Sequence, residues 1–263
     1  MSSETPVLDE VSAVRARGLS KSYELGELAS LKRTLRSITR LGRAQPPVER
    51  FHALRDVSFD IARGEAFTIL GHNGSGKTTM MSILAAITPP SDGWLDVRGR
   101  VVPVLSVGSS FHPDLTGEEN AVLFGTILGL DGDEIAEAMP GIAEFAEMDA
   151  DHMETPVKRF SEGMKARLTF ATALRFPADV YIFDEVLTFA DDHFKATCVD
   201  EMRRLVREGR TVIFVSHELD LVRDICTRGL WLDRGEVRLL GEIEEVAGEY
   251  AAARARHERA IAT

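Results

Sequence analysis

Short apolar runs alternate along the chain with longer segments in which apolar residues recur at three- and four-residue spacing. The runs at 65–70 (EAFTIL), 180–185 (VYIFDE) and 211–217 (TVIFVSH) are almost continuously apolar, which is typical of strands covered on both faces. The segments between them have the period of amphipathic helices. This alternation predicts an α/β fold built on a mainly parallel sheet.

Other stretches depart from that alternation. Residues 11–23 predict a strand that ends in a turn, and 53–61 predict a second strand before the buried run at 65–70. From 112 to 176 the pattern is helical throughout, which predicts a helical subdomain. The last residues, 249–263, predict a short helix.

Composition narrows the class of protein. A chain of 263 residues with 44% hydrophobic residues can form one large domain or two small ones. Its net charge of −11 argues against nucleic acid as the main partner. Two cysteines cannot form a disulfide framework, the N-terminus is acidic rather than a signal peptide, and no apolar run reaches the roughly 20 residues that span a bilayer. We therefore expect a soluble, cytoplasmic chain, for which any membrane role needs another polypeptide.

A glycine-rich segment, GHNGSGKTT at 71–79, lies between a buried strand and a helix and fits the pattern G-x-x-x-x-G-K-[ST]. Glycines allow several backbone N–H groups to turn inward around an anion, and the following helix adds the positive end of its dipole. Lys77 can reach the β- and γ-phosphates of a nucleotide, and the Thr78 hydroxyl can ligate Mg²⁺. The alternative, a flexible turn with a solvated lysine, rarely lies between a strand and a helix. The predicted phosphate-binding residues are Gly71, His72, Asn73, Gly74, Ser75, Gly76, Lys77, Thr78 and Thr79.

Two carboxylates end the apolar run at 180–185, where the carboxyl edge of a parallel sheet faces a ligand crevice. Asp184 is expected to hold Mg²⁺, directly or through water, and Glu185 to orient the attacking water. His217 ends the next strand at the same edge, from which an imidazole can reach a γ-phosphate. Each could be an ordinary strand end on its own, but the phosphate loop upstream favours a functional role.

A further anion site is suggested where Ser161 and Gly163 begin a helix, because free N–H groups and a hydroxyl can bind a phosphate there. Taken alone, Ser161 is better explained as a plain N-cap for Met164 at the third helical position.

The order of these features resembles that of the nucleotide-binding subunit of an ABC transporter, over about residues 11–240. The resemblance implies an ABC-type P-loop ATPase with an N-terminal antiparallel β part, a mainly parallel core sheet and a helical subdomain. It implies ATP and Mg²⁺ as cofactors, adenine stacked on Tyr23, and a head-to-tail homodimer that buries two ATP molecules. In that dimer a signature segment contacts the ATP of the other subunit, and its residues here are Ser161, Glu162, Gly163 and Met164.

Longer segments narrow the resemblance to exporters of O-antigen, capsule or teichoic acid chains. These are 100–130, FSEGM at 160–164 in place of the usual LSGGQ, and 183–198, where Asp191 takes the place of the D-loop aspartate. The resemblance implies export of a lipid-linked polysaccharide through a permease on a separate chain. The subunit would then act peripherally at the cytoplasmic face of the cell membrane.

The domain organisation expected from this resemblance is a single domain, 1–263. Its core lobe covers about 11–105 and 177–240, its helical subdomain about 106–176, and its helical tail 241–263, which leaves no room for a carbohydrate-binding domain.

One departure from the family concerns the glutamine that usually contacts Mg²⁺ and the attacking water. The only glutamine of the chain is Gln45, upstream of the phosphate loop, and Ser106 or Val107 falls near the expected place.

The insert at 28–44 combines an apolar stripe at helical spacing with five basic residues, Lys32, Arg33, Arg36, Arg40 and Arg43. It is interpreted either as a solvated helix packed on its own domain or as a basic amphipathic helix at the membrane face. The polysaccharide exporters that this chain resembles carry such a helix near the membrane.

Other functions remain as alternatives to polysaccharide export. The chain could be an exporter subunit for a different substrate or an ABC ATPase of translation or DNA repair, although those usually carry two cassettes or a long coiled coil. It could also be a nucleotide-binding regulator without turnover, which Glu185 argues against.

Overall fold

The computed structural model describes residues 12–24, 50–104, 111–184, 191–216 and 218–261. Its larger sheet has six strands, in which every neighbouring pair is parallel except the last, a hairpin. In spatial order the strands are β5 (Val101–Val104), β6 (Val180–Asp184), β7 (Thr211–Val215), β3 (Ala66–Leu70), β8 (Arg228–Asp233) and β9 (Glu236–Glu242). The predicted α/β fold with a mainly parallel core sheet is confirmed.

A second, antiparallel sheet contains three strands in the order β2-β1-β4. They are β1 (Ser12–Glu24), β2 (Arg50–Ala62) and β4 (Asp92–Val97). This sheet is the antiparallel β part that the resemblance implied. Strand β2 begins at Arg50 rather than at residue 53, and its register places Phe51 opposite Tyr23.

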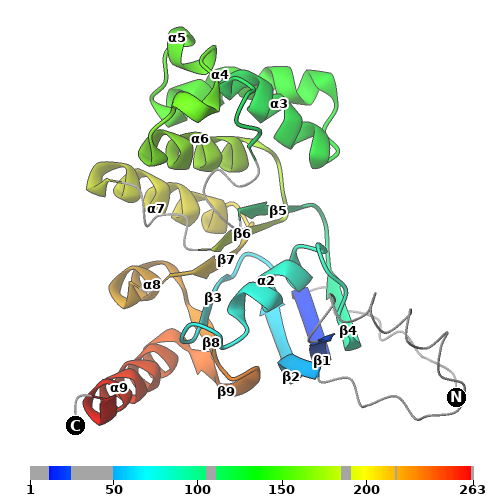
Figure 1. Ribbon diagram of the computed structural model, residues 1–263, viewed down its shortest axis with the longest axis vertical. Coiled ribbons are helices and arrows are strands. Elements are labelled where there is room, and N and C mark those ends of the chain that lie inside the picture. The colour runs from blue at the N-terminus through cyan, green and yellow to red at the C-terminus, as the bar shows by residue number, and fades with distance from the viewer. Residues whose placement is uncertain (1–11, 25–49, 105–110, 185–190, 217, 262–263) are drawn as a thin grey trace, which may run out of the picture.

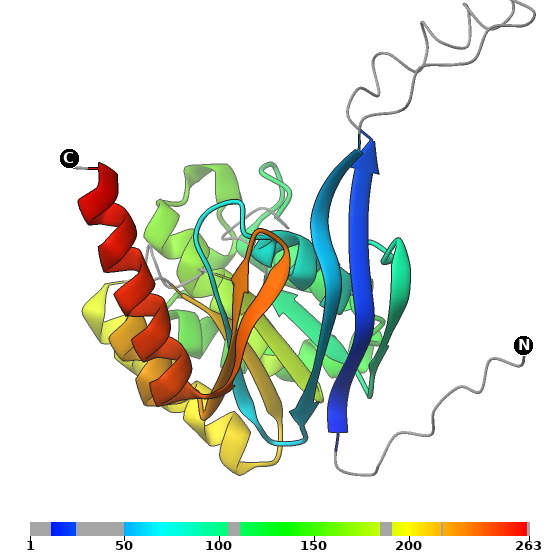
Figure 2. The same ribbon diagram turned by 90° about the horizontal axis from the view of Figure 1, so that it is seen from below.

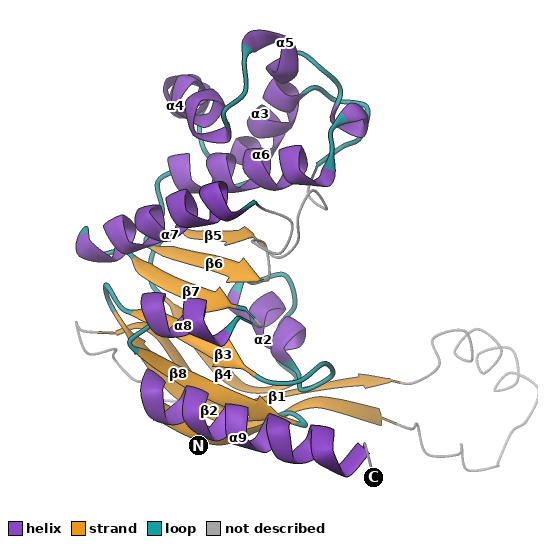
Figure 3. Cartoon of the chain, turned by 90° about the vertical axis from the view of Figure 1, so that its left-hand side faces the viewer, coloured by secondary structure: helices purple, strands orange, loops and turns teal. Residues whose placement is uncertain are grey.

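Helices α3 to α6 form a group beyond the β5 edge of the larger sheet, at the top of Figure 1. They are α3 (Gly117–Ile127), α4 (Gly132–Ala146), α5 (Ala150–Met153) and α6 (Glu162–Arg175), with a 3₁₀ turn η1 (Val157–Arg159). Three further helices, α7 (Asp192–Arg207), α8 (Leu219–Ile225) and α9 (Ile243–Ile261), cover one face of the sheet in Figure 3. Figure 2 shows the β8–β9 hairpin between α9 and the β1–β2 ribbon.

The two faces of the larger sheet belong to two separate hydrophobic clusters. Phe183 and Phe214 point into the cluster shared with the helical group and with α7 to α9. Their neighbours Ile182 and Ile213 point the other way, into the cluster shared with the antiparallel sheet and α2 (Lys77–Leu84). Because successive side chains of a strand alternate between faces, covering both faces requires the continuous apolar runs seen in the sequence.

Local capping fixes where several helices begin and end. Thr116 and Asp131 each form a capping box at the start of α3 and α4. Helix α2 ends at Leu84, two residues before Ala86, which adopts a left-handed conformation with φ of 56°. The C-terminal helix begins at Ile243 rather than at residue 249.

Several sequence predictions concern residues outside the described ranges. They are Glu185, His217, Gln45, Ser106, Val107 and the insert 28–44 with Lys32, Arg33, Arg36, Arg40 and Arg43.

Candidate functional site

The glycine-rich loop leaves the carboxyl end of β3 at Gly71 and leads directly into α2. Gly74 and Gly76 have φ angles of 80° and 108°, which side chains with a Cβ rarely adopt. A Cβ on Gly76 would also lie 2.6 Å from the carbonyl oxygen of Ala53. Within the described residues no side chain caps the first turn of α2, and backbone N–H groups at a helix start can bind an anion. The loop therefore has the backbone of a phosphate cradle.

Two side chains of this loop fit a bound phosphate. Lys77 is 8% exposed, and its ammonium donates to the carbonyl oxygens of Gly71 at 2.6 Å and His72 at 3.2 Å. The hydroxyl of Ser75 is buried without a hydrogen-bond partner among the described residues, and a phosphate oxygen would satisfy it. Thr78 is exposed at the start of α2, where its hydroxyl can reach a ligand or a cation.

Strand β2, which pairs with the Tyr23 strand β1, is linked to the loop through backbone hydrogen bonds. The Arg55 N–H of β2 donates to the Gly235 carbonyl at 2.8 Å, and the Gly235 N–H donates to the Ser75 carbonyl at 2.8 Å. Tyr23 lies opposite Phe51 at the end of the β1–β2 ribbon. These two residues are 41% and 50% exposed, so the ribbon presents two aromatic rings at its end, and Phe51 is two residues from Ala53, which lies against Gly76 of the loop.

Asp184 ends β6 at the same edge of the sheet as the loop. It lies opposite Val215, the last residue of β7, and β7 in turn pairs with β3. The predicted catalytic residues Glu185 and His217 follow Asp184 and β7 closely in sequence but lie outside the described residues. The strand order thus brings Asp184 to the loop's edge of the sheet, as the sequence predicted.

The predicted signature residues begin α6. Ser161 is exposed, and its hydroxyl accepts from the Met164 N–H at 3.1 Å, which makes it an N-cap. Glu162 is exposed, and Gly163 is half-buried. Helix α6 packs against β5, whereas the phosphate loop follows β3, three strands further in. At a strand spacing of about 4.8 Å, the structure therefore does not bring Ser161 to the loop of the same chain.

Asp191 links the helical group to the core. Its carboxylate accepts from the Phe194 N–H at 2.9 Å as the N-cap of α7, and from Arg167 of α6 at 2.7 Å. These bonds, the backbone one first, lower the pKa of Asp191 to about 2. Arg167 also pairs with Glu147 at the end of α4 and lies over the Phe194 ring, 4.9 Å from its centroid.

Three features of the site were missed from the sequence. Phe51 was overlooked because β2 was expected to begin at residue 53, three residues after its observed start at Arg50. Arg167 gave no signal beyond its position five residues into the signature helix. The contact of His72 with Asp233 joins residues 161 apart in sequence, and no local pattern predicts it.

Comparisons with known proteins give the family, the similar sequences and the similar structures of this chain. A sequence model of the ABC transporter family matches residues 54–188. The chain is 37% identical over 206 residues to the O-antigen export system ATP-binding protein RfbB of Klebsiella pneumoniae, covering 78% of this chain and 83% of that protein. It is 37% identical over 202 residues to the teichoic acids export ATP-binding protein TagH of Bacillus anthracis, covering 77% of this chain but only 36% of that protein.

Solved structures show the same fold. A dimeric ATP-binding cassette in a post-hydrolysis state, bound to ADP and Pi, superposes with a TM-score of 0.70 at 22% sequence identity. The superposition covers 88% of this chain and 98% of the other.

Proposed function

The chain belongs to the ABC transporter family, and we propose that it is the ATP-hydrolysing subunit of an exporter of a lipid-linked polysaccharide. The ATPase part rests mainly on the loop at 71–79, in which Lys77 is buried and the Ser75 hydroxyl has no hydrogen-bond partner among the described residues. The substrate class rests on the names of the O-antigen and teichoic acid export relatives.

ATP binding would use two parts of the chain. The N–H groups of the loop and the Lys77 ammonium hold the phosphates, and Tyr23 stacks on the adenine. Thr78 and Asp184 would hold Mg²⁺, and the ion would supply positive charge that offsets the charge of the phosphates. Over the described ranges no group of three or more His, Cys, Asp or Glu forms a metal site of its own.

Hydrolysis would need two copies of the chain. In our proposal Ser161, Glu162, Gly163 and Met164 of one subunit contact the γ-phosphate held by the loop of the other. Glu185 orients the attacking water, and His217 contacts the γ-phosphate from the neighbouring strand. Asp191 would hold the signature helix α6 against α7, because its carboxylate accepts from Arg167 of α6 and from the Phe194 N–H of α7.

Two variants test the ATPase part. Lys77→Ala should abolish high-affinity ATP binding, because it deletes the ammonium buried in the loop. Glu185→Gln should leave binding intact and slow turnover roughly 10²–10⁴-fold, and it should accumulate an ATP-bound dimer in gel filtration. Unchanged ATP affinity in the first variant, or normal turnover in the second, would refute the assigned roles.

A complementation assay tests the shared site. Mixing Lys77→Ala chains with Ser161→Arg chains leaves one intact composite site in each mixed dimer. The mixture should therefore regain ATPase activity beyond the sum of the two variants. No gain on mixing would show that each site lies within a single chain.

Transport requires partners that the sequence alone does not identify. No helix in the described part of the chain is long and apolar enough to cross a membrane. We propose that a homodimer acts at the cytoplasmic face of the membrane on permease subunits made by separate chains, with no role for nucleic acid. The basic insert 28–44 would lie at the anionic membrane surface.

The insert offers a direct test of this location. Replacing Arg36, Arg40 and Arg43 by Gln should leave ATP hydrolysis by the isolated subunit unchanged but reduce polymer export in cells. Equal export at equal expression would refute a role for the insert at the membrane.

A further inference from the structure

The turn of the β8–β9 hairpin lies against the phosphate loop. Only two residues, Arg234 and Gly235, join the strands, since Asp233 at the end of β8 pairs with Glu236 at the start of β9. Their φ angles of 52° and 82° are both positive, as in the tight turns that match the twist of a β ribbon. Such a short connection sets the register of the two strands, and so it also sets where the end of β8 lies.

Two backbone contacts join this hairpin to the loop. The Gly235 N–H donates to the Ser75 carbonyl oxygen at 2.8 Å. The Leu232 carbonyl oxygen lies so close to Gly71 that a Cβ on this glycine would clash with it. The hairpin therefore holds the loop at Gly71 and at Ser75, and residues 72–74 lie between these two points.

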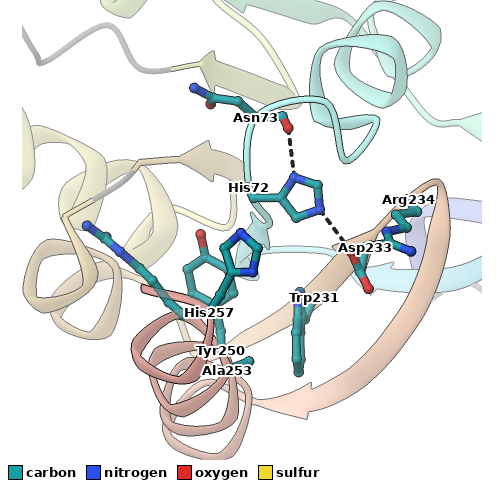
Figure 4. A pocket seen from close by; sticks show the side chains of 9 residues that line it. His72, Asn73, Trp231, Asp233, Arg234, Tyr250, Ala253 and His257 are labelled. Carbon is teal, nitrogen blue, oxygen red and sulfur yellow. Dashed lines mark hydrogen bonds and ion pairs between the residues drawn. The ribbon is translucent and has the colours of Figure 1, made fainter. Parts of the chain in front are cut away.

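A side-chain contact joins the intervening part of the loop to the same hairpin. The Nε2 atom of His72 lies 2.9 Å from a carboxylate oxygen of Asp233, and Figure 4 shows the ring between the loop and the end of β8. Partial burial alone would raise the pKa of Asp233, but its hydrogen bonds with His72 and Arg238 outweigh burial and lower the pKa. The carboxylate is therefore ionised near neutral pH, and it accepts from the His72 N–H.

The backbone of His72 connects this contact to the phosphate-binding groups. Its carbonyl oxygen accepts from the Ser75 N–H at 3.1 Å and from the Lys77 ammonium at 3.2 Å. A rotation of residue 72 would therefore move an acceptor that helps to place the Lys77 ammonium. Because Asp233 holds the His72 ring, it restrains that rotation from outside the loop.

We propose that Asp233 is a positioning residue for nucleotide binding, which holds the phosphate loop through His72 in its binding conformation before the nucleotide arrives. The inference rests on the proposed ATP-binding function of the loop. A site that is already ordered loses less conformational freedom when its ligand binds, so its affinity is higher. Asp233 therefore contributes to affinity. It does not contribute to the rate of hydrolysis at saturating ATP, because the bound phosphates then hold the loop themselves.

Calorimetric titration of the full chain with a non-hydrolysable ATP analogue and with inorganic tripolyphosphate, both with Mg²⁺, measures this contribution. Asp233→Ala should raise the dissociation constant of each ligand about two- to tenfold, the effect of one lost hydrogen bond. Tripolyphosphate has no base, so a parallel loss for both ligands places the effect at the phosphate loop and not at Tyr23. In hydrolysis assays the KM for ATP should rise by a similar factor while kcat stays unchanged.

Three further variants separate this role from a general effect on the hairpin. Arg238→Ala removes the other partner of the same carboxylate, a bond of 3.0 Å, and should change the affinity by less than about twofold. Asp233→Asn keeps an oxygen that can accept from His72, so it should lose less affinity than Asp233→Ala. In a His72→Ala background, Asp233→Ala should cause no further loss, because the two residues act through one contact.

If the wild type binds both ligands, three results would overturn the inference alone. The first is an unchanged affinity in Asp233→Ala. The second is an equal loss in Arg238→Ala, which would indicate a general effect on the hairpin. The third is the same loss from Asp233→Ala with His72 present or replaced, which would show that Asp233 does not act through His72. A wild type that binds neither ligand would instead refute the phosphate-loop assignment, and with it any role of Asp233 in binding.

Discussion

Truncating Phe170 to alanine should loosen the contact between the signature helix and the core sheet. Phe170 of α6 is fully buried and stacks on Phe183 of β6, with ring centroids 4.9 Å apart and planes 6° apart. It also meets Phe194 of α7 edge to face at 6.4 Å. Phe183 immediately precedes Asp184, so this aromatic cluster supports the strand end that carries the predicted Mg²⁺ ligand.

The expected loss of stability follows from this burial. A buried Phe→Ala substitution costs about 3–5 kcal/mol in lost apolar contact and residual cavity. That is a large share of the roughly 5–15 kcal/mol by which a domain is stable. For a domain of this size each kcal/mol lowers the melting temperature by roughly 2–4 °C, so Phe170→Ala should melt about 6–20 °C lower.

Thermal unfolding followed by circular dichroism, without nucleotide, measures the shift. Ile127→Ala is the control, because Ile127 lies on α3 with its side chain 67% exposed. It should change stability by no more than about 0.5 kcal/mol. Phe170→Leu keeps much of the apolar volume and should fall between the wild type and Phe170→Ala. A shift of less than about 2 °C for Phe170→Ala would refute the packing described for the three rings.

Three further predictions concern the nucleotide site and its supports. Gly76→Ala should lower both the melting temperature and the ATP affinity, because the added Cβ would clash with Ala53 at a position whose φ is 108°. Gly129→Ala is the control, since its φ of 78° is also strained but the space around it is open. It should lower the melting temperature less and leave ATP binding unchanged. Phe51→Ala should weaken ATP binding in a titration if Phe51 completes the aromatic end of the ribbon, and unchanged affinity would limit that role to Tyr23. Folding lowers the pKa of Asp191 from 3.8 to about 2. The ionised carboxylate therefore stabilises the fold above pH 3.8, and this stabilisation is lost as the pH falls towards about 2. The difference in melting temperature between the wild type and Asp191→Asn should therefore shrink over that range, and a constant difference would contradict it.

The sequence predicted the elements of the fold better than their arrangement. The buried runs in β3, β6 and β7 and the loop before Lys77 are local signals, because covering both faces of a strand leaves a continuous apolar pattern. The strand order is not local, since β3 pairs with strands more than a hundred residues downstream. Contacts that complete the site, such as those of Gly235 with β2 and the loop, depend on that order. No local sequence pattern predicts them.

The position of β3 has a consequence for how the protein is made. The ribosome releases β3 and the phosphate loop more than a hundred residues before either neighbour of β3 in the sheet, β7 or β8. Until then the five buried residues of β3 have no sheet to join, and the Gly235 link from the loop to the Tyr23 ribbon does not exist. A nascent chain arrested before residue 211 should therefore carry the whole loop motif yet bind no nucleotide. Pairing over such a sequence separation is slow, so the unfinished chain exposes an apolar strand that chaperones can bind.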